Sequence, residues 1–369
     1  MTSGARTRIL IVDDSTVMRS LLRAVISQDP NLEVAGAAAD GEAALNAIDT
    51  LHPDLVLLDV EMPVMDGLVT LRKLRARGHR FPVIMCSSLT QRGAKVTIEA
   101  LASGATDYVA KPSGQSSREA AMQALSHDLI PRIHALTNVP QACLSGAARS
   151  SLLASPKQPP ASFIPAALVI GVSTGGPAAL EILLPQLPAC FPLPVFIVQH
   201  MPELFTMLLA ERLNGRCPLH VHEGFEGEPV RGGSIYIARG NWHMELQAGA
   251  RSGLPATLRL NQDALENHCR PAVDALFRSA AAVYGAGVLA VVLTGMGSDG
   301  MLGARIIREH GGFVLAQDEA SSVVWGMPGA VITAGLAHKV LPLKAIASEI
   351  LRLVSRTHME VHELREAVV

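Results

Sequence analysis

Short apolar runs alternate with segments of helical periodicity in the first third of the chain. Between the first two runs, apolar residues of the segment 17–26 recur every three or four positions and form one stripe. The apolar runs lie at Ile9–Val12, Leu32–Ala35, Leu55–Leu58, Val83–Cys86 and Tyr108–Ala110. Five strands that alternate with helices predict a doubly wound parallel α/β sheet.

A second series of apolar runs follows later in the chain. Strand-like runs occur at Ala167–Val172, Pro194–Val198 and Val288–Leu293. Between them, the stretches Gly232–Ala238 and Ala256–Leu260 alternate between apolar and polar residues, as half-buried strands or hairpins do. This pattern predicts a second parallel α/β sheet that carries an antiparallel β annex.

The composition of the segment between the two series changes abruptly. Residues 137–165 are rich in Pro, Ser, Ala, Gly and Gln, and they keep no apolar period. Such a segment is typical of a flexible linker. We therefore expect one domain at 1–136, a linker at 137–165, a second domain at 166–356 and a tail at 357–369.

Composition and charge exclude several classes of function. The 369 residues are 49% hydrophobic and 17% charged, with a formal net charge of −2 and no cluster of Lys and Arg, so we expect no nucleic-acid partner. No apolar stretch approaches the roughly 20 residues of a membrane helix, so we expect no membrane insertion. The five cysteines are scattered without a CxxC motif, which favours reduced thiols in a cytoplasmic protein. We also expect a monomer.

Polar residues follow the strands of the first predicted sheet. Asp13 and Asp14 follow the first run, Asp59 the third, Ser87 the fourth and Lys111 the fifth. Because these strand ends share one edge, the groups should converge there. Three carboxylates at one edge repel unless a divalent cation such as Mg²⁺ joins them, and a lysine can balance a phosphorylated carboxylate.

The stretch 169–177, Val-Ile-Gly-Val-Ser-Thr-Gly-Gly-Pro, predicts a strand, a tight turn and the start of a helix. Such a turn can expose a hydroxyl at the end of a strand, which makes Ser173 a candidate nucleophile. Two other interpretations stay open from this stretch alone. The glycines can serve only close packing of a helix on a strand, or the turn can bind phosphate at a helix N-terminus.

Two further strand ends carry residues that complement Ser173. His200 follows the second run, and Asp299 follows the third in Leu-Thr-Gly-Met-Gly-Ser-Asp-Gly. A serine hydroxyl needs a base, and the base needs an acid that fixes its tautomer, so the three residues can form a triad. Backbone N–H groups of Gly175, Gly176 and the 295–297 turn lie near the same edge, and Met296 N–H is the preferred oxyanion donor. Taken singly, the histidine can be structural and the aspartate a helix N-cap.

Other polar residues are weaker candidates. His220 and His222 alternate on a predicted strand, but no further metal ligand lies near them in the sequence. Cys269 lies in an ordinary polar run, where a packed or partly exposed thiol is the simpler interpretation. We therefore expect no cofactor in the second domain.

Residues 8 to about 136 resemble the receiver domain of a two-component response regulator. The matching residues are Asp13 and Asp14, Asp59 followed by Glu61-Met-Pro-Val-Met-Asp-Gly67, Ser87, and Lys111-Pro112. The resemblance implies a flavodoxin-like fold in which a histidine kinase phosphorylates Asp59. It also implies that Asp14, Asp59 and the backbone carbonyl of Glu61 hold Mg²⁺, with Asp13 nearby. Tyr108 is either the family's aromatic switch residue or an edge packing residue.

The second domain is similar to the catalytic domain of chemotaxis protein-glutamate methylesterases of the CheB type. The strings Gly-Val-Ser-Thr-Gly-Gly-Pro, Gln-His-Met-Pro and Leu-Thr-Gly-Met-Gly-Ser-Asp-Gly carry this resemblance. It implies Ser173 as nucleophile, His200 as base and Asp299 as orienting acid, in a Rossmann-like sheet. The implied substrates are glutamate γ-methyl esters of methyl-accepting chemotaxis receptors, with deamidation of specific glutamines. A receiver that inhibits until Asp59 is phosphorylated fits this arrangement.

Two other functions remain open. The second domain can be a phosphorylation-switched binding module without chemistry, which replacement of Ser173 by alanine would leave active. Alternatively, the esterase can act on a receptor outside chemotaxis or on another methyl ester. The absence of a helix-turn-helix pattern and of basic clusters argues against DNA-binding output.

Overall fold

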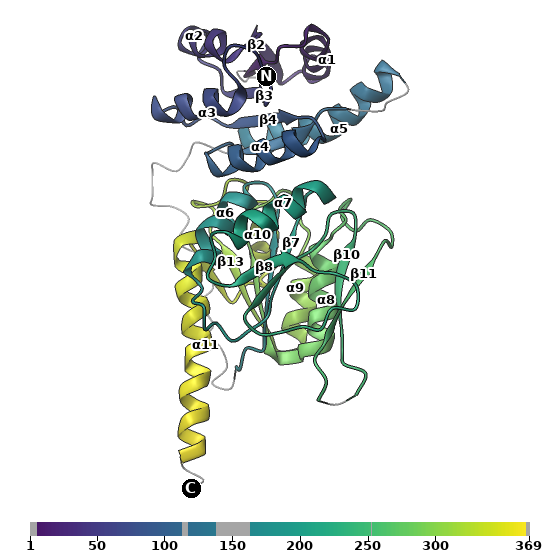
Figure 1. Cartoon of the computed structure of the whole chain (residues 1–369), viewed down its shortest axis with the longest axis vertical. Coiled ribbons are helices and arrows are strands. Elements are labelled where there is room, and N and C mark those ends of the chain that lie inside the picture. The colour runs from purple at the N-terminus through teal and green to yellow at the C-terminus, as the bar shows by residue number, and fades with distance from the viewer. Residues whose placement is uncertain (1–5, 113–116, 138–162, 252, 367–369) are drawn as a thin grey trace. The chain divides into compact units, whose positions relative to one another are not determined.

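The computed structural model describes residues 6–112, 117–137, 163–251 and 253–366, with side chains up to Ser355. The chain divides into two compact units, residues 1–141 and 142–369 (Figure 1). Each unit is built on its own parallel sheet with helices packed against it. The predicted fold class, two α/β domains with an antiparallel annex in the second, is confirmed.

The first unit contains a five-stranded sheet in the order β2-β1-β3-β4-β5. All neighbouring strands are parallel. The strands are β1 (Thr7–Val12), β2 (Leu32–Ala38), β3 (Leu55–Asp59), β4 (Val83–Ser87) and β5 (Asp107–Ala110). β3 and β4 are buried along their whole length because helices cover both faces of the sheet, which is why they read as unbroken apolar runs. The strand order is that of flavodoxin-like folds.

Five helices connect and cover these strands. They are α1 (Thr16–Ile26), α2 (Gly41–Leu51), α3 (Gly67–Ala76), α4 (Gln91–Ala102) and α5 (Arg118–Thr137). The first four each begin after a residue whose side chain accepts a hydrogen bond from the first turn: Ser15, Asp40, Asp66 and Thr90. These caps satisfy N–H groups that a helix start leaves without a partner. A capping residue in the sequence thus marks the start of each of these four helices.

The second unit is built on a seven-stranded parallel sheet in the order β14-β13-β12-β6-β7-β9-β8. The strands are β6 (Ala167–Val172), β7 (Val195–Gln199), β8 (His220–Glu223), β9 (Ser234–Ile237), β12 (Val288–Val292), β13 (Phe313–Gln317) and β14 (Lys339–Leu341). β10 (His243–Gln247) and β11 (Thr257–Asn261) form a separate antiparallel pair. The run at 232–238 therefore belongs to the main sheet as β9, and only the run at 256–260 belongs to the annex.

The helices of the second unit follow its strands. They are α6 (Gly176–Leu183), α7 (Glu203–Asn214), α8 (Val273–Tyr284), α9 (Met301–Glu309), α10 (Met327–Thr333) and α11 (Leu343–Glu366), with short 3-10 turns η1 (Leu184–Gln186) and η2 (Gly285–Gly287). The backbone of α11 continues through most of the predicted tail at 357–369. Residues 138–162 of the predicted linker lie outside the described residues.

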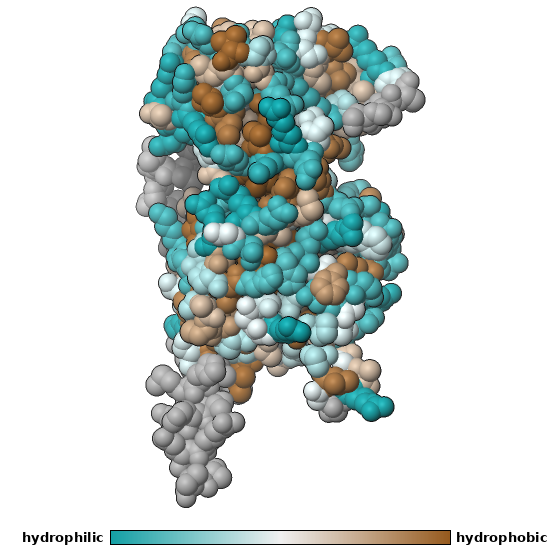
Figure 2. Space-filling view, viewed as in Figure 1, coloured by the Kyte–Doolittle hydropathy of each residue, from teal (hydrophilic) through white to brown (hydrophobic). Residues whose placement is uncertain are grey.

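No helix among the described residues is long and apolar enough to cross a membrane. On the face shown in Figure 2, hydrophobic residues lie among hydrophilic ones over both units. The apolar residues that the sequence pattern assigned to β6, β7 and β12 are instead in the interior, where they are fully buried.

Gly171 lies in β6, the strand that leads to Ser173, and packs closely against the first turn of α8. A Cβ at this position would overlap the Val273 side chain, with Cγ2 only 2.9 Å away. The Val273 N–H, in the same first turn of α8, donates a hydrogen bond to Asp299. The absence of a side chain at Gly171 therefore sets the distance between the strand and the helix.

We predict that Gly171→Ala destabilises the second unit by about 1–3 kcal/mol, because the extra methyl group overpacks a filled contact. Both tryptophans, Trp242 and Trp325, lie in this unit, so their fluorescence during urea unfolding follows it alone. Gly215→Ala is the control, since a Cβ there meets nothing closer than 3.5 Å. Equal unfolding midpoints for both variants would contradict the prediction.

Candidate active site

Four polar residues of the first unit meet at the carboxyl ends of its strands. Asp13 and Asp14 follow β1, Asp59 ends β3, and Lys111 follows β5. The Lys111 ammonium lies 2.7 Å from Asp13 Oδ2 and 2.7 Å from Asp59 Oδ2. Asp13 and Asp59 are buried, whereas Asp14 is exposed. One lysine thus balances two buried carboxylates at an edge that solvent reaches.

Burial and the neighbouring charges at this edge change the pKa of Asp59 and of Lys111. Burial raises the pKa of Asp59 to about 6, although the hydrogen bond and charge of Lys111 lower it. Burial lowers the pKa of Lys111, but its hydrogen bonds to Asp13 and Asp59 outweigh this and raise the pKa above its ordinary value. The lysine therefore stays charged. A divalent cation would further favour the ionised form of Asp59.

The acidic residues at this edge fit a hard divalent cation. Asp13, Asp14 and Asp59 each offer a carboxylate oxygen, and these atoms lie within 4.8 Å of one another. Carboxylates are the ligands that Mg²⁺ prefers. The backbone N–H of Glu61 donates to Asp59 Oδ1 at 3.4 Å, which places Glu61 beside the cluster. We therefore regard this cluster as a candidate Mg²⁺ site.

Two other residues expected at this edge are buried. Ser87, the last residue of β4, donates from Oγ to the Ser88 carbonyl at 3.2 Å. Tyr108 in β5 is 7% exposed, and burial raises the pKa of its phenol above the ordinary value. In this structure the ring of Tyr108 therefore packs into the unit.

In the second unit, three adjacent strands bring distant residues together. β6 lies between β12 and β7 in the sheet, so Ser173, at the end of β6, is flanked by the segments after both neighbours. The His200 N–H donates to the Val172 carbonyl at 3.2 Å, and the Ser173 N–H donates to the Thr294 carbonyl at 3.0 Å. These backbone bonds tie the two flanking segments directly to the turn that contains Ser173.

The Asp299 carboxylate binds His200 and the start of α8. His200 Nε2 lies 2.8 Å from Asp299 Oδ2, and the same oxygen accepts the Val273 N–H at 2.7 Å. Oδ1 accepts the Asp274 N–H at 3.0 Å and Asn267 Nδ2 at 2.9 Å. The carboxylate thus binds the N-terminus of α8, where a negative charge is favourable. Asp299 is not the N-cap of α9, which is Gly300.

The hydrogen bonds of this pair decide its protonation. Burial would raise the pKa of Asp299, but hydrogen bonds from His200, Val273 and Asp274 hold it below the ordinary value. Burial would lower the pKa of His200, but its contacts with Asp299 and Cys269 raise it to about 9. Asp299 is therefore a carboxylate that stabilises a positive charge on the imidazole.

The second ring nitrogen of His200 faces a thiol. Cys269 Sγ lies 3.6 Å from His200 Nδ1. Because Asp299 binds Nε2, the neutral ring carries its proton there and leaves the Nδ1 lone pair available as a base. Among the described residues, no hydrogen bond joins Ser173 Oγ to this nitrogen. Such bonds are often absent without substrate and form when it binds.

Comparisons with known proteins match both units. A family model described as CheB methylesterase matches residues 168–350, and one described as response regulator receiver domain matches residues 9–123. A protein-glutamate methylesterase/protein-glutamine glutaminase of a Nocardioides species is 50% identical over 355 residues, 95% of this chain and 96% of that protein. One of Trichodesmium erythraeum is 46% identical over 354 residues, 94% and 99% of the two chains.

A solved structure is similar to the second unit of this chain. The crystal structure of the Thermotoga maritima CheB methylesterase catalytic domain is 43% identical, with a TM-score of 0.50, and covers 52% of this chain and 99% of that one. The chain belongs to the CheB methylesterase family. The predicted combination of a receiver domain with a methylesterase domain is therefore confirmed.

In this CheB family member, the candidate oxyanion donors differ in availability. The Gly176 N–H donates to the Ser173 carbonyl at 2.8 Å and is already used. The Met296 N–H makes no hydrogen bond within the described part of the chain. It belongs to a turn in which Gly297 has a φ of +82°, a conformation that glycine adopts readily. The Gly175 N–H likewise makes no hydrogen bond among the described residues, and Met296 stays the predicted oxyanion donor.

Sequence reasoning overlooked several buried polar residues that hold this CheB site together. Thr294 Oγ1 donates to the Thr174 carbonyl at 2.9 Å, and Gln317 Oε1 accepts the Thr294 N–H at 2.8 Å. Gln199 Nε2 donates to the Ser173 carbonyl at 3.0 Å. Thr294 and Gln199 lie inside the quoted motifs, but Gln317 comes from β13 and only the fold brings it near.

The histidines of β8 do not form a metal cluster in the described part of this family member. His222 Nε2 lies 2.8 Å from Glu228 Oε1, and the rings of His220 and His222 are 4.7 Å apart. The one group of His, Cys, Asp and Glu residues found among the described residues that could hold an ion is the Asp cluster of the receiver domain. His222 is therefore a structural histidine at the sheet edge.

We predict that Cys269→Ala lowers the pKa of His200 from about 9, because the sulfur that accepts a hydrogen bond from the protonated Nδ1 is lost. The measurement is an NMR titration of the His200 ring in the full chain labelled at histidine. Cys217→Ala is the control, because the neighbouring charges of Cys217 are Glu181 and Arg216 and include no histidine. A pKa of His200 that stays the same or rises would refute the role of the thiol.

Proposed function

We propose that this chain hydrolyses glutamate γ-methyl esters of methyl-accepting chemotaxis receptors, with Ser173 as nucleophile, His200 as base and Asp299 as orienting acid. The hydrogen bond between His200 Nε2 and Asp299 Oδ2, formed beside the turn that presents Ser173, carries the proposal. It gives the imidazole a fixed tautomer and a partner for its positive charge. The names of the Nocardioides and Trichodesmium relatives support the same substrate chemistry.

The proposed reaction begins with attack of Ser173 Oγ on the γ-carbonyl carbon of the methyl ester. His200 Nδ1 takes the hydroxyl proton, and Asp299 stabilises the imidazolium through Nε2. The carbonyl oxygen becomes negative and accepts the Met296 N–H. When the intermediate collapses, the C–O bond to the methoxy group breaks, and His200 gives its proton to the methoxy oxygen, which leaves as methanol.

The second half of the reaction releases the product. Water gives a proton to His200 Nδ1 and attacks the γ-glutamyl ester of Ser173, and Ser173 leaves with that proton. The product is a free glutamate side chain. A glutamine side chain presents the same carbonyl, and its amide nitrogen would leave as ammonia. We therefore also propose deamidation of specific glutamines.

We further propose that phosphorylation of Asp59 controls this activity. A chemotaxis histidine kinase would supply the phosphoryl group, and Asp14, Asp59 and the Glu61 carbonyl would hold Mg²⁺. Mg²⁺ would neutralise charge on the phosphoryl oxygens, while Lys111 and Ser87 would bind them. The unphosphorylated receiver would inhibit the catalytic unit. A few kcal/mol of differential interaction suffices for such a bias. We place the reaction in the cytoplasm.

We predict that Ser173→Ala lowers methanol release from methyl-labelled receptor at least about 1,000-fold, because the acyl-enzyme cannot form. Ser279→Ala in α8 is the control, since its hydroxyl donates to the Leu276 carbonyl of its own helix. Methanol release by Ser173→Ala above about one tenth of that of the unmodified protein would show that Ser173 is not the nucleophile.

We predict that Asp59→Asn removes activation by a small-molecule phosphodonor with Mg²⁺, while basal methanol release persists. The amide cannot accept the phosphoryl group, so the receiver stays in its inhibiting state. Asp49→Asn, on the exposed face of α2, should retain activation. If the phosphodonor activates Asp59→Asn as it activates the unmodified chain, Asp59 is not the acceptor.

A further inference from the structure

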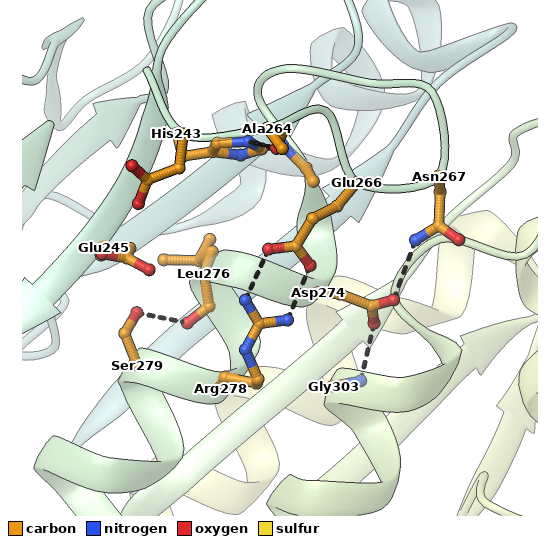
Figure 3. Close-up of polar contacts among 12 residues, drawn as sticks. His243, Glu245, Ala264, Glu266, Asn267, Asp274, Leu276, Arg278, Ser279 and Gly303 are labelled. Atoms are coloured by element: carbon orange, nitrogen blue, oxygen red, sulfur yellow. Dashed lines mark hydrogen bonds and ion pairs between the residues drawn. The ribbon is translucent and has the colours of Figure 1, made fainter. Parts of the chain in front are cut away.

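Asp299 has a second buried carboxylate beside it. Asp274 is 1% exposed and Asp299 2% exposed, and the Asp274 N–H donates to Asp299 Oδ1. Two buried carboxylates on neighbouring side chains repel unless hydrogen-bond donors lie between them. Asp274 accepts the Gly303 N–H from α9 at 2.6 Å, on the side away from Asn267 (Figure 3).

The Asn267 amide lies between the two carboxylates. Its Nδ2 is 3.0 Å from Asp274 Oδ2 and 2.9 Å from Asp299 Oδ1. An amide nitrogen carries two hydrogens, so it can donate one to each carboxylate. Figure 3 shows the Asn267 side chain reaching toward Asp274 from the loop that precedes α8. One neutral group therefore bridges both negative charges.

The turn that carries Asn267 is held in place from both sides. The Glu266 N–H donates to the Cys269 carbonyl at 3.1 Å, and the Cys269 N–H donates to the Glu266 carbonyl at 2.8 Å. The Glu266 carboxylate receives two hydrogen bonds from Arg278 of α8, at 2.6 and 2.7 Å, as Figure 3 shows. Asn267 has a φ of +50°, a left-handed conformation that asparagine tolerates.

The same turn contacts both members of the His200–Asp299 pair. Asn267 binds the carboxylate, and Cys269 lies against His200 Nδ1. We propose that Asn267 is a positioning residue, which bridges Asp299 and Asp274 and so keeps the Asp299 carboxylate ionised and directed at His200. This inference rests on the proposed function, because it assigns Asn267 to the same hydrolysis.

The bridge explains why Asp274 can lie beside the acid of the site. Burial and the charge of Asp299 already raise the pKa of Asp274, while the hydrogen bonds from Gly303 and Asn267 lower it. Without the amide, repulsion would raise the pKa of Asp274 further or turn Asp299 away from His200. Either change weakens the support of the imidazolium that forms during attack. Asn267 is proposed to act on Asp299 and not on substrate binding, so kcat should fall while KM stays near its value.

The test is a double-mutant cycle in the full chain, assayed by methanol release from methyl-labelled receptor. Asn267→Gly keeps the left-handed turn and removes the amide, and we expect kcat to fall about 10- to 100-fold, as the loss of hydrogen bonds to a charged group does. Asn267→Asp keeps the shape but replaces the donor by an oxygen, and it should lose at least as much. His268→Asn, in the same turn with a φ of +62°, is the control that should leave kcat unchanged.

The second arm of the cycle measures two further variants. One combines Asp274→Asn with Asn267→Gly, and the other carries Asp274→Asn alone. Removing the neighbouring charge makes the bridge unnecessary, so the double variant should regain most of the kcat lost in Asn267→Gly. A residue that only stabilises the turn would show no such rescue. Tryptophan fluorescence during urea unfolding checks that each variant is folded.

Three outcomes test the Asn267 bridge and the proposed hydrolysis separately. A loss in kcat with rescue by Asp274→Asn supports the bridge. An Asn267→Gly variant within twofold of the unmodified protein, or a loss that Asp274→Asn does not reduce, overturns it. If the unmodified protein and Ser173→Ala release methanol equally, the proposed function itself fails, and that result is independent of Asn267.

Discussion

The buried charge of Asp299 is the constraint around which the catalytic unit is organised. A carboxylate removed from water is costly unless its oxygens receive hydrogen bonds or an opposite charge. Here the partners are the His200 ring, the Gly300 N–H, the first N–H groups of α8 and the Asn267 amide. Apart from the adjacent Gly300, they come from two segments that are far from Asp299 in the sequence, at residue 200 and at residues 267–274. The group that can orient the imidazole is therefore complete only after the sheet, α8 and the preceding loop have packed together.

The receiver unit handles buried carboxylates in another way. Asp13 and Asp59 share the ammonium of Lys111, while Asp14 remains exposed beside them. A cluster with more negative than positive charge is suited to bind a cation and to exchange ligands at its open side. In the catalytic unit the donors are mostly neutral, so the imidazole of His200 carries the change in charge. The two units thus place a similar group, a buried aspartate at the carboxyl end of a parallel sheet, in different electrostatic surroundings.

Much of the fold could be predicted because its strands are unbroken apolar runs. Runs such as 55–58 and 288–293 became central strands, since only a sheet covered on both faces buries every residue of such a run. The run at 232–238 was harder to assign. Its alternation predicted a half-buried strand, but Ile235, Tyr236 and Ile237 are all buried, and β9 pairs in parallel with β7 and β8 rather than in the annex. Alternation in so short a run therefore identified neither the burial of the strand nor its neighbours.

The residue types at the strand ends were visible in the sequence: a hydroxyl at Ser173, an imidazole at His200, and acids at Asp59 and Asp299. The pattern also indicated that parallel strands would bring them to shared edges. It could not indicate that Asp299 takes His200 through Nε2, that Cys269 faces the other nitrogen, or that Asn267 bridges two carboxylates. Those arrangements depend on a left-handed turn packed against α8. Distances across space between such segments arise only when the whole unit folds, because no local pattern of residues encodes them.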